Sequence, residues 1–352
     1  MKKNYRDLTI APFSYLTPSL TNISTAFLVL LAPQIIMLII TKAYSSLILI
    51  ATSILSSVLA EFISNKIRRV NTLFDLTAIV QGLFIGMFIP QNYPILPVFF
   101  IVLLSLLLVK YVFGGNADSW INPAAYTVII IYFLGISFFP EFLITKEYLE
   151  SGNPGIQLIQ NGDIPVLEFD SSFTFWLNTH FFSRLGIEIP SGYLSMFWDT
   201  QSLIPAFRFN ILTLISSMIL ISLGIINWIV PSTFLLVYGV LVRLFSQTPF
   251  TGIIGQGDLL LAFLTSGTLF VAFFIIDFYG TTPITNLGKI LYGVIVGLIA
   301  FLITGCGTSP IGAMFTVLFA NVISPLIQLL EDKIYSVWVN KTIRNNHYAW
   351  NK

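Results

Sequence analysis

Long stretches without a charged residue alternate with short polar segments along this chain. The charge-free runs cover residues 8–41, 43–60, 76–109, 119–140, 209–242, 259–276 and 290–330. A helix needs about 20 apolar residues to cross the hydrocarbon core of a bilayer, so these continuously apolar runs predict membrane-spanning helices. The strands of a membrane barrel would instead be about ten residues long with alternating polarity, a pattern that these runs lack.

Turn-forming residues divide the longer runs. The run 76–109 is interrupted at Pro90 and Pro94, the run 209–242 near Asn227 and Pro231, and the run 290–330 at a glycine-rich turn. We therefore expect an all-α polytopic membrane protein of about ten transmembrane helices. The expected spans are 22–41, 44–63, 73–90, 95–113, 120–139, 207–227, 229–246, 258–279, 286–304 and 308–330. They give N-terminal helices (1–139), a long loop (140–206), C-terminal helices (207–330) and a tail (331–352).

The composition of the 352 residues agrees with this class. Hydrophobic residues make up 56% and charged residues 9%, whereas soluble domains are about 25% charged. The net charge of +1 excludes nucleic-acid binding by bulk charge. A single cysteine, Cys306, excludes an internal disulfide, and two distant histidines predict no metal site. The sequence has no phosphate-binding loop, dinucleotide fingerprint or nucleophile triad.

The basic residues orient the expected spans, because cytoplasmic loops carry an excess of lysine and arginine. With a cytoplasmic N-terminus, the basic residues outside are Lys42, Lys146, Arg184, Arg208 and Arg243. Those inside are Lys2, Lys3, Arg6, Lys66, Arg68, Arg69, Lys110, Lys289, Lys333, Lys341, Arg344 and Lys352. The inside is clearly the more basic side, so both termini are expected in the cytoplasm.

The long loop, residues 140–206, would lie outside under this topology. It is acidic, with Lys146 and Arg184 as its bases, and it carries an aromatic stretch from Phe173 to Trp176. Aromatic residues favour the membrane interface, so part of the loop is expected there. The loop is either a connector or a functional segment, and structureless loops of this length are uncommon.

Two parts of the chain resemble each other. Asp75 and Asp258 each precede an apolar run, which leads to a proline-containing turn, another span and a glycine-rich turn. The repeats occupy spans 3–5 and 8–10, so they would cross the membrane in opposite directions. Inverted repeats with Gly and Pro interruptions are typical of a transport pathway. The alternative is a gene duplication in which turn residues only form turns.

Several residues are candidates for an ion pathway. Asp277 lies near the end of span 8, and an ionisable group at membrane depth is a functional candidate; the alternative is a carboxylate at the interface. We expect Asp75, Asp258 and Glu61 at the interface. Cys306 is either a small residue that fits its turn or a sulfur ligand shared with another subunit. The repeat breaks add further candidates, namely Gly114, Gly115, Asn122, Gly305 and Gly307.

The order of several motifs carries a family resemblance. Residues 112–115, followed by Asn122, Pro123 and Ala124, resemble the "FGG…NPA" segment of the NqrB/RnfD family. Its members are membrane subunits of the Rnf electron transport complex and of the sodium-translocating NADH:quinone reductase. Residues 281–293 are similar to that family's "TSPxT…GK…YG" stretch. Further matches are Ala11 and Pro12, residues 228–232, and Asn321 with Pro325. The resemblance covers about residues 11–330.

The resemblance implies a ten-helix subunit, with inverted repeats of the urea-transporter type, in the bacterial cytoplasmic (inner) membrane. With other subunits it would form a translocase that couples electron transfer between carriers such as NADH, ferredoxin or quinone to Na⁺ or H⁺ movement. Members of the family carry FMN, joined through its phosphate to the threonine of an "SGATPL" motif in the long loop.

This chain departs from the family at that motif. Ser151, Gly152 and Asn153 occupy its place, and the acceptor threonine aligns with Pro154. Proline has no hydroxyl and cannot form a phosphoester, so FMN would be noncovalent or lost unless Ser151 or Thr145 replaces the acceptor. The family's "GETS" stretch is not recognisable at residues 205–209, and its "ATDP" aspartate has only Asp277 as a near counterpart.

Three functions remain open on the sequence alone. The first is a redox-coupled ion-translocating subunit with a noncovalent flavin. The second is a scaffold or ion-path subunit that has lost its flavin, which Pro154 favours. The third is a solute channel or carrier on the same inverted-repeat fold.

Overall fold

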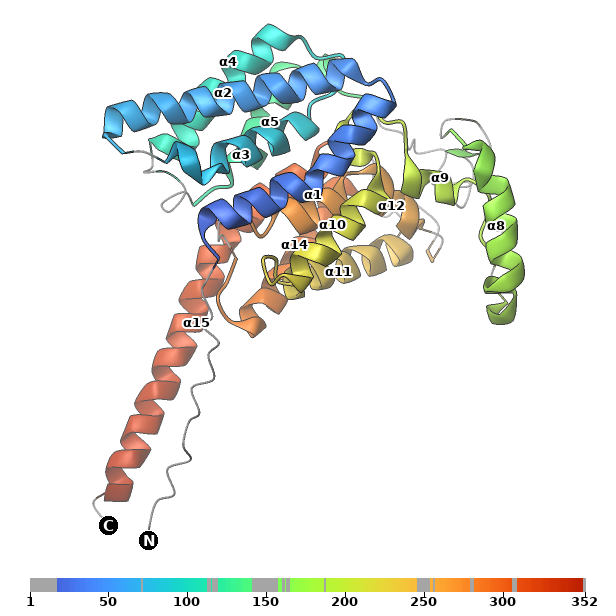
Figure 1. The fold of residues 1–352 in the computed structure, drawn as a ribbon. Helices are drawn as coiled ribbons and strands as arrows, with labels where there is room; N and C mark the ends of the chain where they lie inside the picture. The colour runs from blue at the N-terminus through green and yellow to red at the C-terminus, as the bar shows by residue number, and fades with distance from the viewer. Residues whose placement is uncertain are drawn as a thin grey trace, which may run out of the picture.

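Four helices of the computed structural model are long and apolar enough to cross a membrane. They are α1 (Leu20–Ile40), α2 (Tyr44–Arg68), α14 (Asn286–Thr304) and the part Gly312–Val337 of α15 (Gly312–Trp350). The structure describes residues 18–70, 72–112, 115, 120–140, 158–159, 162, 165–186, 188–245, 254–255, 257–278, 282–305 and 309–350. The regular secondary structure in these ranges is helical (Figure 1).

Shorter helices occupy the other expected spans. They are α3 (Thr77–Met87), α4 (Ile95–Leu106) continued by the π-helix η2 (Leu107–Tyr111), α5 (Pro123–Leu134), α10 (Asn210–Ser222) and α11 (Ile229–Phe245). Span 8 is divided into α12 (Leu259–Thr265), α13 (Thr268–Phe270) and the π-helix η6 (Val271–Ile275). Each of the ten expected segments therefore contains helix, while the number of complete crossings stays a prediction.

Two of these segments are shorter than expected because of local backbone conformation. The 11 residues of α3 reach only about 16 Å at 1.5 Å per residue. A short 3₁₀ turn, η1 (Leu73–Asp75), precedes α3, and Leu76 then takes a left-handed conformation with φ of 57°. In span 8, Gly267 has φ of 67° and separates α12 from α13. A glycine adopts this conformation without steric cost.

The long loop contains helices of its own, and the end of the chain continues the last helix. The loop contains α8 (Glu168–His180), η4 (Phe182–Leu185), α9 (Tyr193–Trp198) and η5 (Pro205–Phe207), and η3 (Ile136–Phe138) precedes it. The last span was expected to end near residue 330, but α15 continues without a break to Trp350 and projects from the body (Figure 1).

The helices form two groups that lie against each other. In the first group, α2 packs on α3 and α4, and α4 packs on α5; in the second, α14 packs on α11 and α15. Contacts of α1 with α10 and of α5 with α15 join the groups. We call the end that carries α8 and α9 the loop end, and the end where α15 projects the tail end (Figure 1). Asp258 caps α12, which packs on α9 at the loop end. At the tail end, α2 ends with Arg68 (Figure 1), and Glu331 of α15 accepts a hydrogen bond from Thr285, the cap of α14.

Glycines let helices approach closely within each group. A Cβ atom on Gly82 would lie 2.6 Å from Cα of Ile54 in α2, and one on Gly86 would lie 2.6 Å from Cα of Ile50. In the second group, a Cβ atom on Gly297 of α14 would lie 3.0 Å from the carbonyl oxygen of Phe234 in α11. Small residues at helix crossings are the usual device for packing helices within lipid.

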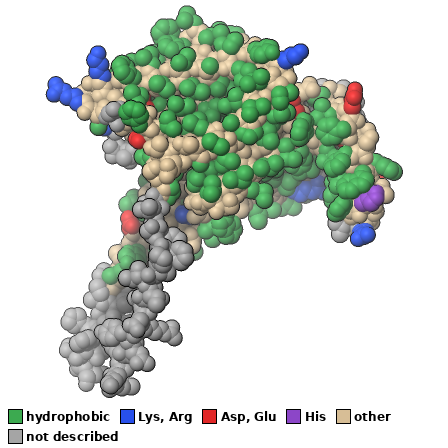
Figure 2. Space-filling model, in the orientation of Figure 1, with side chains coloured by type: hydrophobic (Ala, Val, Ile, Leu, Met, Phe, Trp, Pro, Cys, Tyr) green, Lys and Arg blue, Asp and Glu red, His purple; other side chains and the backbone are tan. Residues whose placement is uncertain are grey.

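The outer surface is apolar over most of the body. Figure 2 shows hydrophobic side chains across the face formed by α1, α2, α10 and α11. Leu55, Leu236 and Leu326 are among the large side chains that are more than half exposed. Soluble proteins do not present contiguous apolar surface on this scale, whereas lipid covers it at no cost. The protein is therefore a multi-pass membrane protein.

A buried carboxylate fastens α8 to the rest of the loop. Asp170 is fully buried and accepts hydrogen bonds from the amide of Gly192 (2.7 Å), from the amide and hydroxyl of Ser195 (2.6 and 2.5 Å) and from the hydroxyl of Thr174 (3.0 Å). Burial raises the pKa of Asp170, but the hydrogen bonds from Ser195, Gly192 and Thr174 outweigh it, so its pKa lies below the usual value.

This carboxylate makes the attachment of α8 dependent on pH. Because the folded pKa of Asp170 is lowered, its contribution is fully present above the unfolded value of about 3.9 and is lost as pH falls through the lower folded value. We expect Asp170→Asn to loosen α8 and α9 at neutral pH by about 1.5–3 kcal/mol. Hydrogen exchange at the amides of Gly192 and Ser195 measures this. Protection that is equal in the wild type and in Asp170→Asn would contradict it.

Candidate functional site

Phenyl rings fill the centre of the molecule, where the two groups of helices meet. Phe84 of α3 packs edge-on against Phe27 of α1 at 5.8 Å and against Phe270 of α13 at 6.0 Å between ring centroids. Phe274 of η6 lies 4.8 Å from Phe270. The cluster is completed by Phe88, Phe207 and Phe278. An apolar plug of this kind offers no hydrogen-bonding group to water or to an ion.

Asn122 connects the two groups beside this plug. Its side-chain oxygen Oδ1 accepts hydrogen bonds from the amides of Ala124 (3.0 Å) and Ala125 (3.2 Å), which caps α5. Its Nδ2 donates to the carbonyl oxygen of Ile275 in η6 at 2.9 Å, and the side chain is fully buried. Both Asn122 and Asp277 were candidates from the sequence, and the structure brings Asn122 to a carbonyl only two residues before Asp277.

Asp277 has a carboxylate without a hydrogen-bond partner. Both of its oxygens are buried and have no donor among the residues that the structure describes. The hydroxyl of Tyr292, in α14, is equally buried and unpartnered within the same set, and it lies within the influence of the Asp277 charge. The positive charge of Lys289 also acts on Asp277. A buried group of this kind needs water, an ion or a proton to balance it.

The structure describes two more of the candidates, Gly115 and Gly305. Gly115 adopts a positive φ of 103° near Arg68 at the tail end. Gly305 has φ of 56°, and its carbonyl oxygen accepts a hydrogen bond of 2.7 Å from Tyr238. Other candidates fall outside the described residues, namely Gly114, Gly307, Cys306, Thr145, Ser151, Gly152, Asn153 and Pro154.

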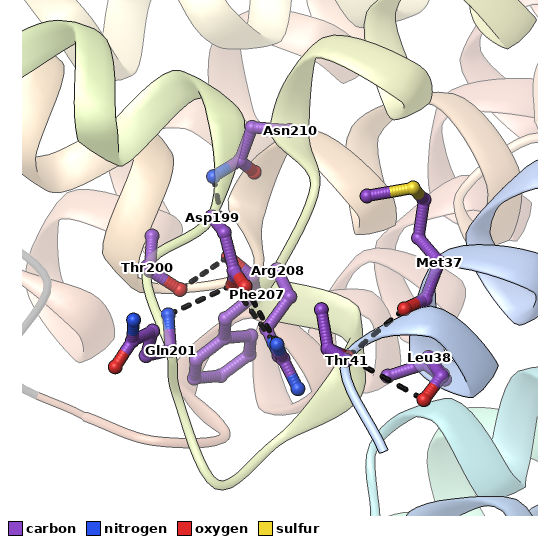
Figure 3. A network of polar contacts seen from close by, with 9 residues as sticks. All are labelled: Met37, Leu38, Thr41, Asp199, Thr200, Gln201, Phe207, Arg208 and Asn210. Atoms are coloured by element: carbon purple, nitrogen blue, oxygen red, sulfur yellow. Dashed lines mark hydrogen bonds and ion pairs between the residues drawn. The ribbon is translucent and has the colours of Figure 1, made fainter. Parts of the chain in front are cut away.

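A buried ion pair at the loop end was not anticipated from the sequence. Arg208 donates from Nε and Nη2 to the two oxygens of Asp199, at 2.8 and 2.6 Å (Figure 3). Asp199 also accepts from the amide of Gln201, and Thr200 donates to the carbonyl oxygen of Phe207. This bidentate pair of hydrogen bonds holds the segment that leads into α10. An acid and a base nine residues apart form no recognisable motif, so the pair left no signal.

Asn210 completes this connection at the start of α10. Its side-chain nitrogen Nδ2 lies within hydrogen-bond distance of three backbone carbonyl oxygens, those of Met196 (3.1 Å), Phe207 (3.2 Å) and Leu264 (2.9 Å). The side chain therefore ties α9, η5 and the end of α12 to one point. These carbonyls belong to segments that leave regular helix, where backbone groups need partners from side chains.

Two acids that were expected at the interface are buried in the protein. Glu61 is 2% exposed and lies among polar groups of α2, α3 and η2. Asp258 is 5% exposed; it caps α12 by accepting from the amide of Leu261 and also accepts a hydrogen bond from Tyr193. The interfacial position of both groups in the membrane stays a prediction.

A cavity of about 310 Å³ opens beside Asp258 at the loop end. Its charged lining consists of Glu188, Arg243 and Asp258, and Tyr193 contributes its ring. Leu158, four residues after Pro154, is fully buried in the same hydrophobic cluster as Tyr193. The degenerate motif at residues 151–154 lies outside the described residues, and Ile159, downstream of it, lies against Gly192, the neighbour of Tyr193 in the chain.

The residues near this cavity do not fit the FMN attachment of the resemblance. A phosphoester needs a hydroxyl, and Pro154 has none. The cavity offers one guanidinium, on Arg243, which already donates to the carbonyl oxygen of Gly257 at 3.1 Å. Two carboxylates, on Glu188 and Asp258, face the same space and would repel a phosphate group.

Comparison with known proteins places most of the chain in one family. Residues 8–335 match the family described as "NQR2, RnfD, RnfE family". The chain is 28% identical over 334 residues to the D-type subunit of the ion-translocating oxidoreductase complex of Haemophilus ducreyi, covering 87% of this chain and 93% of that protein. It is 25% identical over 296 residues to the D-type subunit of the Na⁺-translocating ferredoxin:NAD⁺ oxidoreductase complex of Acetobacterium woodii, covering 83% of each.

The role of Asn122 can be separated into a helix cap and a link between the two groups. Asn122→Ala removes both, and we expect it to lower the free energy of unfolding by about 2–4 kcal/mol. Asn122→Ser keeps an oxygen for the cap but loses the donor to Ile275, so its loss should be smaller, about 1–3 kcal/mol. Denaturant titration of the purified protein in detergent measures both values. Equal losses for the two variants would contradict the separation.

Proposed function

The chain belongs to the NQR2, RnfD, RnfE family, and from this membership we propose that it is the D-type membrane subunit of a redox-driven, ion-translocating electron transport complex. The family match over residues 8–335 carries this proposal. The named relatives belong to ion-translocating oxidoreductase complexes, one of them Na⁺-translocating. The chain would therefore work with the other subunits of an Rnf- or Nqr-type complex in a bacterial cytoplasmic membrane and couple electron transfer to Na⁺ or H⁺ movement.

The proposed architecture is a pair of inverted repeats of the urea-transporter type, with ten spans. The two groups of helices support it, since α4 packs on both α2 and α5 much as α14 packs on both α11 and α15. Glycines with positive φ stand at opposite ends, Gly115 at the tail end and Gly305 at the end of α14. Exposed tryptophans near both ends, Trp228 on one side and Trp176 and Trp198 on the other, suit two membrane interfaces.

The tail end would face the cytoplasm. Basic residues gather there, at Lys66 and Arg68 in the last turn of α2, at Arg69 directly after it, and at Lys333 on the projecting part of α15. This agrees with the excess of lysine and arginine in cytoplasmic segments. In this orientation both termini lie inside, and the acidic loop with α8 and α9 lies outside.

The ion pathway would run between the two repeats, past Asn122 and Asp277. Asp277 offers two unpartnered oxygens on the cytoplasmic side of the phenyl plug, and the glycine turns at 114–115 and 305–307 would flank the route. The plug disfavours the alternative of a permanently open solute channel, because ring centroids 4.8–6.4 Å apart leave no continuous passage. Ion passage would require movement of these rings, and electron transfer in the complex would drive it.

The flavin is the point where this subunit would differ from its family. Family members hold FMN, which supplies one- and two-electron transfer when bound. With Pro154 at the acceptor position, we propose that this chain carries no FMN on the family's residue. A noncovalent flavin or none is the expected state. The second candidate function, a flavin-less ion-path or scaffold subunit in which neighbouring subunits pass electrons, is favoured by Pro154 and by the acidic cavity near Leu158.

Redox-driven ion movement in inverted membrane vesicles tests the proposed function. Vesicles that contain the complete complex should accumulate Na⁺ or H⁺ when an electron donor and acceptor are supplied, and vesicles without this subunit should not. We expect Asp277→Asn to lower ion accumulation by at least about tenfold while Leu55→Ala, on the lipid-facing surface of α2, leaves it unchanged. Accumulation that persists in full without the subunit would refute the proposal.

The flavin content of the purified chain tests the proposal that it carries no FMN on the family's attachment residue. We expect no flavin fluorescence in the denatured band of the wild-type chain, because Pro154 offers no hydroxyl. Pro154→Thr, co-expressed with a flavin transferase, should make the band fluorescent if the surrounding loop is still recognised. Flavin released from the wild-type chain by denaturation would assign a noncovalent site. A fluorescent wild-type band that disappears in Ser151→Ala would instead place FMN on Ser151 and overturn the expectation.

A further inference from the structure

Two opposite charges are buried at the tail end of the first group without forming an ion pair. Glu61 of α2 is 2% exposed and Lys110 of η2 is 1% exposed. The charge of Glu61 acts on Lys110, but the structure records no contact within 4 Å between their charged atoms among the residues it describes. Instead, Nζ of Lys110 donates to Oε1 of Gln81 at 2.9 Å and lies 4.9 Å from the ring centre of Tyr111. We call the region between these two charged groups, which make no direct contact, the gap.

Several polar atoms around this gap have no partner in the described part of the chain. Oε1 of Glu61 accepts from the hydroxyl of Thr72 at 2.6 Å, but Oε2 is buried and unpartnered. The hydroxyl of Tyr111 and Nε2 of Gln81 are buried and unpartnered as well. The orientation of Gln81 is fixed, because its oxygen must face Lys110. Lys110 has three N–H donors and uses one.

Asn65 adds an acceptor on the side of the tail end. The hydroxyl of Thr72 lies 3.0 Å from Oδ1 of Asn65 and 2.6 Å from Glu61, but it has a single hydrogen and cannot donate to both. Turning the Asn65 amide lets its nitrogen donate to Thr72, which resolves the conflict. Its oxygen then takes the buried position that has no partner. Asn65 is half-buried, so it stands between the gap and the surface.

The π-helix places two of these groups together. In η2 the amide of Val112 donates to the carbonyl oxygen of Leu107, five residues back. The amide of Gly115 likewise donates to the backbone carbonyl oxygen of Lys110. The added residue per turn allows the consecutive residues Lys110 and Tyr111 both to lie near Glu61. Single π-turns are uncommon and occur most often at functional sites.

We propose that internal water joins Glu61 to Lys110 and that this cluster of Glu61, Asn65, Gln81, Lys110 and Tyr111 exchanges a proton with the aqueous phase at the tail end. Water fits the unpartnered atoms because water molecules, each accepting at most two hydrogen bonds, can accept from Lys110, Gln81 and Tyr111 and can donate to Oε2 of Glu61. Sodium fits poorly, because it requires oxygen ligands and would meet an ammonium group and an amide N–H. The role of this cluster as a proton-loading site rests on the proposed function.

The proton exchange is balanced in charge and atoms. A proton from the tail-end aqueous phase passes along the water to Oε2 of Glu61, where an O–H bond forms, while Lys110 stays an ammonium. The net charge of the Glu61–Lys110 pair changes from 0 to +1, and release of the proton to the aqueous phase reverses the step. Other titratable or charged groups on the packed elements are exposed or half-exposed, namely Lys66, Arg68 and Arg69 on α2 and Asp75 on η1.

Infrared titration of the full chain in lipid nanodiscs tests the cluster without a need for the other subunits. We expect a carboxylic-acid stretching band that appears on acidification in the wild type and is missing in Glu61→Gln. In Lys110→Met the same band should show a proton bound at least about tenfold more tightly, because the facing positive charge is gone. Tyr111→Phe removes only a hydroxyl and should shift the titration in a protein that folds normally. The control is Ser57→Ala, which loses a buried hydrogen bond between α2 and α3 and should titrate as the wild type.

Vesicles that contain the complete complex then test the role of the cluster. Glu61→Gln should lower the number of ions moved per electron by at least about tenfold, with Ser57→Ala unchanged. A wild-type carboxyl band that survives in Glu61→Gln, or a band that Na⁺ shifts at constant pH, would overturn the proton site. Absent ion movement in wild-type vesicles would refute the proposed function, while the infrared titration would still decide on the proton site.

Discussion

The absence of water in the hydrocarbon core is the constraint on which this structure depends. Every backbone carbonyl and amide that leaves regular helix within the membrane must find a partner inside the protein. Asn122 supplies a donor to the carbonyl of Ile275 in the π-helix of span 8, and Asn210 lies against three carbonyls at the start of α10. Broken helices are tolerated at these points because a buried amide side chain stands beside each break.

The same constraint explains which features could be derived from the sequence. Charge-free runs located the helices, since lipid-facing segments exclude charges whatever their tertiary contacts. Glycine and proline marked the breaks, and Asn122, a candidate from the sequence, lies against the carbonyl of Ile275, two residues before Asp277. These features are local in the chain, so their residue types carry the signal.

Features that depend on pairing across the chain left no comparable signal. The Asp199–Arg208 pair, the approach of Glu61 and Lys110, and the phenyl plug each join residues from different elements. The burial of Glu61, beside Thr72 and near Lys110 of η2, likewise depends on residues from other elements. The π-helices themselves depend on the packing of neighbours, and nothing in the composition of residues 107–111 or 271–275 distinguishes them from α-helix.

The continuity of α15 has a mechanical consequence. The helix of 39 residues is about 58 Å long at 1.5 Å per residue, and it runs from its contacts with α5 and α14 into the projecting segment. Its Trp350 end lies about 38 Å beyond Pro325, a residue at which helices bend. A tilt of about 5° at that point moves the far end by about 3 Å by lever geometry. A small change in helix direction at Pro325 therefore becomes a displacement of several ångströms at the Trp350 end of α15.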